Sequence, residues 1–207
     1  MSGIPHPDRV PGLELDEMPE DVAALLGVTV TNVAGDEVGG GAPPRTKPLH
    51  ILTVIAHHPT FLAPFIEWAT ALAWHGLLTR REQEILALRV AVNCRSEFEW
   101  GHHVVYARAA GMTEDDIDRV VAGSDAPDWT DSERALVRAA DGLTSSSFDI
   151  ADETWDVLRA HFDDARLTEI PFVVGQYAML SMFANSLGVV LEPGYEALPV
   201  DGVRRRS

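Results

Sequence analysis

The sequence predicts an all-helical fold, a compact orthogonal bundle, and three observations favour it. Apolar residues recur at spacings of three and four along most of the chain after residue 48, which is the period of a helix with one buried face. Three threonines are each followed, three positions later, by an acidic residue, and this pattern marks the first turn of a helix. Alternation of the strand type is weak and confined to residues 28–33.

The N-terminal region, residues 1–47, is predicted to be a Pro- and Gly-rich arm and loop. Residues 1–19 contain four prolines and little apolar periodicity, so we expect an extended arm that lies on the domain or on a neighbouring subunit. A short helix is expected over residues 20–26, and the glycines and prolines of residues 35–44 predict a loop.

Residues 48–192 form the predicted helical domain, and a C-terminal tail covers residues 193–207. Within the domain, three threonines are positioned to cap first turns, paired as Thr79 with Glu82, Thr113 with Asp116 and Thr130 with Glu133. The apolar stripe through Phe61, Phe65, Trp68 and Leu72 predicts a helix that ends near Gly76. Periodicity predicts further helices through Ile85, Leu88 and Val92, from residue 111 to about 122, and over 133–143, 152–161 and 167–187.

The composition sets limits on the class of protein. The chain has 207 residues, of which 46% are hydrophobic and 23% charged, and one domain with one core is expected. A net charge of -16 opposes binding to a phosphate backbone, so we expect no nucleic-acid partner. No export signal and no run of about 18 uncharged apolar residues is present, so we expect no membrane span. A single cysteine, Cys94, excludes a dithiol centre within one chain and favours the cytoplasm.

The densest group of polar residues lies in residues 89–108. On a helix Ser96, Glu99 and His103 share one face. Glu84 falls on the same helical stripe as Leu88, so it should face inward, where a carboxylate needs a partner. We expect that partner to be His103, and together with Glu99 these residues are candidates for acid/base chemistry.

The order and spacing of these residues resemble a known superfamily, that of the carboxymuconolactone decarboxylases and AhpD-like proteins. Its pattern of Glu, Cys-x-x-Cys and x-x-x-His is similar to Glu84, Ser96, Glu99 and His103, followed here by residues 109–112. The resemblance covers residues 48–192, including the later Gly175, Gln176, Tyr177 and Asn185. It implies the AhpD-like helical fold and a homo-oligomer, with a trimer, a hexamer or a dimer all allowed.

Both thiol positions of that pattern lack a cysteine in this chain. Ser96 and Glu99 occupy them, and Cys94 lies two residues earlier, on roughly the opposite side of a helix. The peroxidase members use a Glu and His relay to activate the cysteine pair, a reaction this chain cannot perform in that way. The resemblance therefore implies the decarboxylase branch, which needs no cofactor and releases carbon dioxide with proton transfer to carbon.

In this reading the chain is a lyase or isomerase that acts on a small carboxylated or lactone substrate. His103 would donate or accept the proton, Glu84 would orient it, and Glu99 would be a second acid/base or a substrate contact. We place the pocket between the helix that carries Glu84 and the helix with residues 96–106. The candidate substrate-binding residues are Ser96, Trp100, Arg89 and Tyr106, with Arg95 and Arg108 as other cations that could hold a carboxylate.

Several alternatives stay open on the sequence. Four histidines at positions 57, 58, 102 and 103 suggest a metal site, but adjacent helical residues point about 100° apart, so we predict none. Trp68, Trp74 and Trp100 are expected in the core or at a subunit interface. A peroxidase or antioxidant protein that uses Cys94, and a non-catalytic binding protein in which Glu84 and His103 only fix the packing, are the alternative functions.

Overall fold

Helices make up the regular structure of the chain. The computed structural model describes residues 6–33, 47–199, 202 and 204, and in them it contains α-helices and one short 3-10 turn but no strand. The predicted all-helical class is therefore confirmed. The helices are α1 (Glu20–Val33), α2 (His50–Ile55), α3 (Pro59–His75), α4 (Arg80–Asn93), α5 (Glu97–Ala109), α6 (Glu114–Ala122), α7 (Asp131–Leu143), α8 (Asp152–His161) and α9 (Asp164–Leu187).

The three predicted caps are all present. Thr79, Thr113 and Thr130 are the N-cap residues of α4, α6 and α7, and each forms a reciprocal capping box with the acid three positions on. In the first of them, Oε2 of Glu82 accepts a hydrogen bond from the backbone amide of Thr79 at 2.7 Å. A cap of this kind stabilises a helix by about 1 kcal/mol, so these short motifs fix where three helices begin.

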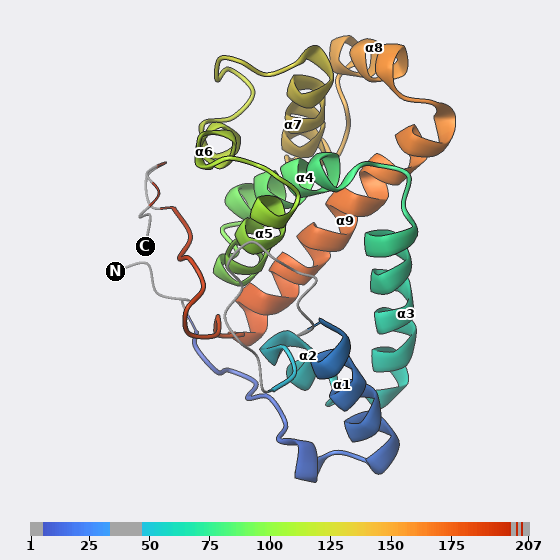
Figure 1. Cartoon of the computed structure of the whole chain (residues 1–207), viewed down its shortest axis with the longest axis vertical. Helices are drawn as coiled ribbons and strands as arrows, with labels where there is room; N and C mark the ends of the chain where they lie inside the picture. Colours follow the sequence, from blue (N-terminus) through green and yellow to red (C-terminus); the bar gives the residue numbers. More distant parts are fainter. Residues whose placement is uncertain (1–5, 34–46, 200–201, 203, 205–207) are drawn as a thin grey trace.

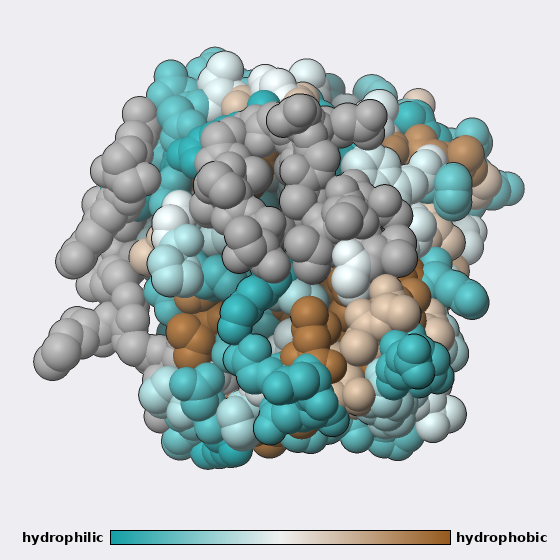
Figure 2. Space-filling view, turned by 60° about the horizontal axis from the view of Figure 1, so that its bottom comes forward, coloured by the Kyte–Doolittle hydropathy of each residue, from teal (hydrophilic) through white to brown (hydrophobic). Residues whose placement is uncertain are grey.

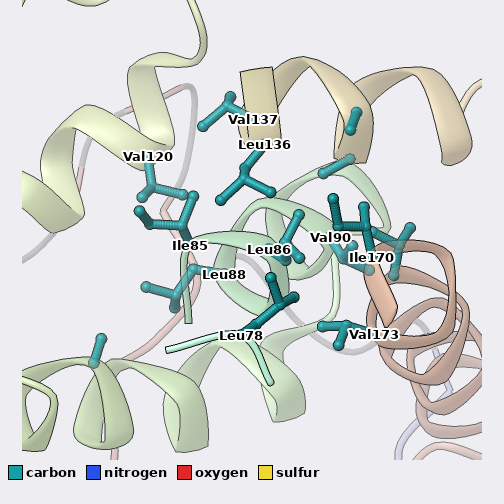
Figure 3. Packing of buried hydrophobic residues seen from close by; sticks show 14 of the residues in the cluster. Leu78, Ile85, Leu86, Leu88, Val90, Val120, Leu136, Val137, Ile170 and Val173 are labelled. Carbon is teal, nitrogen blue, oxygen red and sulfur yellow. The ribbon is translucent and has the colours of Figure 1, made fainter. Parts of the chain in front are cut away.

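Helix α4 is the central element of the larger core. Its middle residues, Ile85 to Leu88, are fully buried, because α5, α6, α7 and α9 surround it. Figure 3 shows side chains of α4 meeting Val120 of α6, Leu136 of α7 and Ile170 of α9. The helix is thus buried along most of its length, and a buried polar side chain on it, such as Gln83 or Glu84, needs a partner inside the protein.

A second, smaller core joins the N-terminal elements to the end of α9. It contains residues of the arm, α1, α2 and the start of α3, together with Phe98 and Ala184. These elements lie at one end of the molecule (Figure 1), and the view from that end shows separate apolar patches in a mostly hydrophilic surface (Figure 2). The described part of the arm lies on its own domain, where the Asp8 amide donates to the Gly188 carbonyl at 2.8 Å.

Helix α1 is longer than the sequence predicted. It continues from the expected residues 20–26 through residues 28–33, where the weak alternation lies. Once a helix has started, each added residue gains a hydrogen bond, and this outweighs a weak preference for extended backbone. The loop predicted for residues 35–44 lies outside the described residues.

Helix α3 ends at His75 as predicted, but its aromatic stripe is not buried within the chain. Phe61 and Trp68 are 62% and 42% exposed, and Trp74 is 65% exposed, whereas Trp100 is fully buried. The reason is that α3 packs mainly on α1 and α2 and stands apart from α4 (Figure 1). Of the three tryptophans only Trp100 lies in the core, and an interface role for the other two stays a prediction.

Helix α9 is long and apolar enough to cross a membrane by length and composition alone. Half of its apolar window is buried inside the protein, and it packs on α4, α5, α7 and α8. These contacts identify α9 as a core helix of the bundle. Beyond it, the described end of the tail is also tied down, since Arg204 pairs with Glu196, Glu114 and Asp118.

Candidate active site

Helix α5 carries the candidate residues, and its start explains how they are placed. Ser96 is the N-cap, and its hydroxyl accepts the amide of Glu99 at 3.4 Å. From that fixed start, Glu99, His103 and Tyr106 fall at spacings of four and three along one face. Ser96 is fully buried and does not reach the cavity described below, so its role is to start the helix.

Glu84 and His103 form a buried pair between α4 and α5. The Nδ1 atom of His103 lies 2.7 Å from Oε2 of Glu84, which confirms the predicted contact. The other oxygen of Glu84 accepts from Nη2 of Arg80 at 3.0 Å. Because Arg80 stabilises the ionised carboxylate, Glu84 accepts a hydrogen bond, and Nδ1 of the imidazole carries the hydrogen. The Nε2 atom is then left for chemistry on the other side of the ring.

Glu99 lies on that other side. Its Oε2 atom is 3.6 Å from Nε2 of His103. Burial raises the pKa of Glu99 to about 7, although the nearby His103 acts in the opposite direction. Its Oε1 atom is buried and has no hydrogen-bond partner in the described part of the chain. A buried carboxyl with a near-neutral pKa can both donate and accept a proton at physiological pH.

These groups face a cavity of about 400 Å³. Its polar lining residues are Thr70, Arg80, Glu99, His102, His103, Tyr106, Gln176 and Tyr177, and the rest of its wall is mostly apolar side chains of α2, α3, α5 and α9. Glu84 lies behind His103 rather than on the wall. The predicted position between α4 and α5 is therefore wrong: only Arg80 of α4 reaches the cavity, because the apolar middle of α4 is enclosed by the core.

Two tyrosines complete the surroundings of the imidazole. The ring of Tyr177 on α9 meets His103 edge to face at 4.3 Å, and that of Tyr106 does so at 5.5 Å. Burial, followed by the charges of Glu84 and Glu99, raises the pKa of Tyr177 well above its usual value. Tyr177 therefore remains a neutral phenol that can donate a hydrogen bond within the site.

Other candidate residues lie away from the cavity. Arg89 pairs with Asp141 and donates to two carbonyls at the end of α6, and Trp100 is fully buried in the core. Arg108 pairs with Glu114 and Glu196, and Arg95 is an exposed residue in the turn before α5. None of these four is among the residues that line the cavity. The cations predicted to hold a substrate carboxylate are thus engaged or placed elsewhere.

Five polar lining residues were not among the predicted site residues: Thr70, Arg80, His102, Gln176 and Tyr177. Arg80 lies four residues before Glu84, a spacing at which a cation and an acid meet on a helix, so the sequence did contain a signal for it. His102 contacts Glu192 at 2.8 Å. The two residues are 90 positions apart in the sequence, and no local pattern predicts their contact.

Metal and thiol chemistry find little support in the described residues. No group of three or more His, Cys, Asp or Glu side chains among them is placed to hold a metal ion. Cys94 is half-buried at the end of α4, does not line the cavity, and burial raises the pKa of its thiol. A raised pKa leaves less thiolate at neutral pH, which is the opposite of what a reactive cysteine requires.

Comparison with known proteins shows which family the site-bearing segment resembles. Residues 59–142 match the sequence model of the Carboxymuconolactone decarboxylase family, and this segment runs from α3 to α7 and contains Glu84, Glu99 and His103. The predicted resemblance to the carboxymuconolactone decarboxylase and AhpD-like superfamily is confirmed over this segment. The comparison with curated proteins gave no match.

Several solved structures are similar to this chain in fold. A peroxidase-related protein with an alkylhydroperoxidase AhpD core from Ralstonia eutropha JMP134 is 21% identical with a TM-score of 0.74, covering 91% of this chain and 94% of that one. A peroxidase-related protein from Silicibacter sp. TM1040 is 18% identical, also at 0.74, over 93% and 97%. The debrominase Bmp8, in complex with 2,3,4-tribromopyrrole, is 14% identical at 0.69, over 89% and 91%.

Proposed function

We propose that this protein is a cofactor-free enzyme, a decarboxylase-like lyase or isomerase that moves a proton on a small carboxylated or lactone substrate. One observation carries the proposal. His103 is fixed by Glu84 through Nδ1 at 2.7 Å, while Glu99, with a pKa of about 7, lies 3.6 Å from Nε2 on the wall of a 400 Å³ cavity. A fixed base beside a near-neutral acid is the arrangement that general acid–base catalysis requires.

The proposed reaction follows from this arrangement. As the bond from the substrate carbon to its carboxylate breaks, carbon dioxide leaves and the electron pair stays on the carbon. Glu99, or His103 when it is protonated, then donates a proton to that carbon, and water restores the proton to the donor. Tyr177 would hold a developing oxyanion of a lactone or enolate by hydrogen bonding.

The experiment is a screen of the purified protein with carboxylated lactones and related acids, following carbon dioxide release. Glu99→Gln keeps the size of the side chain but cannot transfer a proton, and His103→Ala removes the imidazole. We expect either change to lower turnover by about 10²- to 10⁴-fold. His161→Ala, at the exposed end of α8, is the matched control and should turn over like the native protein.

The alternatives make different predictions in the same screen. A thiol-dependent peroxidase would lose activity in Cys94→Ser, whereas the proposed enzyme would not, because Cys94 lies outside the cavity. A binding protein in which Glu84 and His103 only fix the packing would show no turnover on any acid. In that case His103→Ala would lower stability alone, and the proposal would be abandoned.

We also propose that the protein is a cytoplasmic homo-oligomer. Exposed apolar side chains gather on two helices, as Phe61, Trp68 and Trp74 on α3 and Phe172, Met179 and Met182 on α9. The rings of Trp68 and Phe172 meet at 5.4 Å, so the two sets are continuous there. Light scattering of the native protein should give a mass that is a multiple of the 22.6 kDa chain mass. In Phe172→Glu the measured mass should be lower. A monomeric native protein would exclude the oligomer.

A further inference from the structure

Arg80 reaches the cavity from the first turn of α4, a position outside the family pattern of Glu84, Ser96, Glu99 and His103. Its guanidinium group donates three hydrogen bonds within the chain. Nη1 donates to the Ala73 carbonyl at 2.9 Å and to Oε1 of Gln83 at 2.8 Å, and Nη2 donates to Glu84 at 3.0 Å. The guanidinium group is therefore held in one position at the cavity wall.

Gln83, which accepts a hydrogen bond from Arg80, is itself held in place by other hydrogen bonds. Gln83 is buried and donates from Nε2 to the Leu72 carbonyl and to Glu169, both at 3.2 Å. Glu169, on α9, also accepts the amides of Leu77 and Leu78 in the turn between α3 and α4. A cation held in this way loses little conformational entropy when an anion binds to it.

Arg80 also has hydrogen-bonding capacity to spare. Nε makes no hydrogen bond within the described part of the chain, and Nη2 uses one of its two hydrogens. Nε and Nη2 lie on one side of the planar guanidinium group, and this fork matches the two oxygens of a carboxylate. The side chain is 38% exposed, so the fork is accessible. The exposed indole of Trp74 lies 5.3 Å from the guanidinium carbon and covers one of its faces.

The rest of the cavity wall determines the chemical nature of the ligand body that carries the carboxylate. Side chains such as Phe65, Ile66, Phe98 and Leu180 form most of its wall, and a volume of about 400 Å³ suits a small molecule. Arg80 and His103 bind the two oxygens of one carboxylate, that of Glu84, so they are close neighbours. An acid held by Arg80 would therefore extend past Glu99 and His103.

We propose that Arg80 is the specificity-determining residue, and that it binds the carboxylate of a small acid whose body is an apolar ring or chain. This inference rests on the proposed function for the identity of the reacting end. The binding step itself is independent of any reaction and can be measured with a molecule that does not react.

The test compares benzoate with benzamide, a neutral molecule of the same shape, by calorimetry on the full-length protein. We expect the native protein to bind benzoate more tightly by on the order of ten-fold or more. Arg80→Gln should lose that preference while its affinity for benzamide is kept. Arg159→Gln, an exposed arginine on α8, is the matched control and should keep the native preference.

A second variant separates recognition from support of the fold. Arg80→Lys keeps the charge beside Glu84 but loses the planar fork, so benzoate should bind with intermediate affinity, and this variant carries the test if Arg80→Gln does not fold. Equal binding of benzoate and benzamide by the native protein, or an equal loss of both in the variants, would overturn the proposal. Benzoate preference without turnover in the screen would remove the proposed reaction but keep the binding assignment.

Discussion

Two neighbouring histidines of α5 each contact a glutamate at short distance, but their surroundings differ. The Nδ1 atom of His103 lies 2.7 Å from Glu84, and the Nε2 atom of His102 lies 2.8 Å from Glu192. Both side chains reach the wall of the same cavity. A buried pair of imidazole and carboxylate therefore does not by itself identify a catalytic residue.

The difference lies in what surrounds each pair. Glu84 belongs to the central helix α4, is 1% exposed and is shared with Arg80, and its histidine faces a second acid, Glu99. Glu192 belongs to the segment after α9, is 24% exposed at its side chain and also accepts the amide of His50 at 2.7 Å. The first pair is a fixed part of the core beside an acid with a near-neutral pKa, and the second fastens one segment of the chain to another.

The largest expected difference between the pairs is in turnover. With an acid identified by the carbon dioxide screen, His103→Ala should lower kcat by about 10²- to 10⁴-fold. His102→Ala should lower it by less than about ten-fold, because its contact with Glu192 holds the segment after α9 and the loss is one of cavity shape. Steady-state kinetics on both variants measures this, and equal losses would show that the two histidines act as one unit.

The pairs should also differ in stability when the acid is removed. Glu84→Ala leaves Arg80 and His103 without their shared partner inside the core, which should cost about 3–5 kcal/mol and lower the melting temperature by roughly 10 °C. Glu192→Ala should cost about 1 kcal/mol, since that carboxylate is partly solvated. Thermal unfolding followed by circular dichroism measures both, and a larger loss for Glu192→Ala would reverse the assignment of the fixed pair.

Local patterns predicted a large part of this structure. The three capping boxes and the ends of α8 follow from spacings of three and four in the chain. The chemistry of such motifs is complete within a few turns, so no tertiary information is needed. The same argument covers Arg80, whose four-residue spacing from Glu84 was available but not used.

The parts that could not be predicted depend on contacts distant in sequence. Arg89 appeared free to bind a substrate, but Asp141, 52 residues later, pairs with it. The exposure of Trp68 and Trp74 depends on where α3 stands relative to α4, which its own periodicity does not fix. In the same way, the near-neutral pKa of Glu99 comes from burial by several elements, and no feature of residues 96–103 shows it.

Glu99, beside the first pair, and Glu192, in the second, should affect the pH dependence of stability with opposite signs. Burial raises the pKa of Glu99 to about 7, so the folded state keeps a proton that the unfolded state loses above about pH 4.5. The contribution of Glu99 to the free energy of unfolding is therefore complete below about pH 4.5 and is lost as the pH rises through 7. This loss amounts to roughly 3 kcal/mol. Burial opposes the charge of Glu192, but the hydrogen bond and charge of His102 lower its pKa overall, so its contribution is lost as the pH falls below about 4.5.

Urea unfolding over a series of pH values separates these effects. Glu99→Gln should flatten the loss of stability between about pH 4.5 and pH 7, and Glu192→Gln should flatten the loss on the acid side. Glu67→Gln, an exposed acid on α3, should leave both slopes as they are in the native protein. A slope near neutral pH that survives Glu99→Gln would mean that another group titrates there.

The smallest expected effect is local and concerns the segment that Glu192 fastens. In Glu192→Gln the contact with His102 weakens, while the ring of Tyr195 still lies 4.2 Å from that imidazole, so the segment should loosen without detaching. Hydrogen exchange of the amides of residues 189–196 should rise by about five-fold, which corresponds to roughly 1 kcal/mol, and that of α5 should not change. Glu153→Gln, an exposed acid on α8, serves as the control. Faster exchange throughout α5 would show that the Glu192 contact supports the catalytic helix itself, and the distinction between a fixed pair and a fastening pair would then fail.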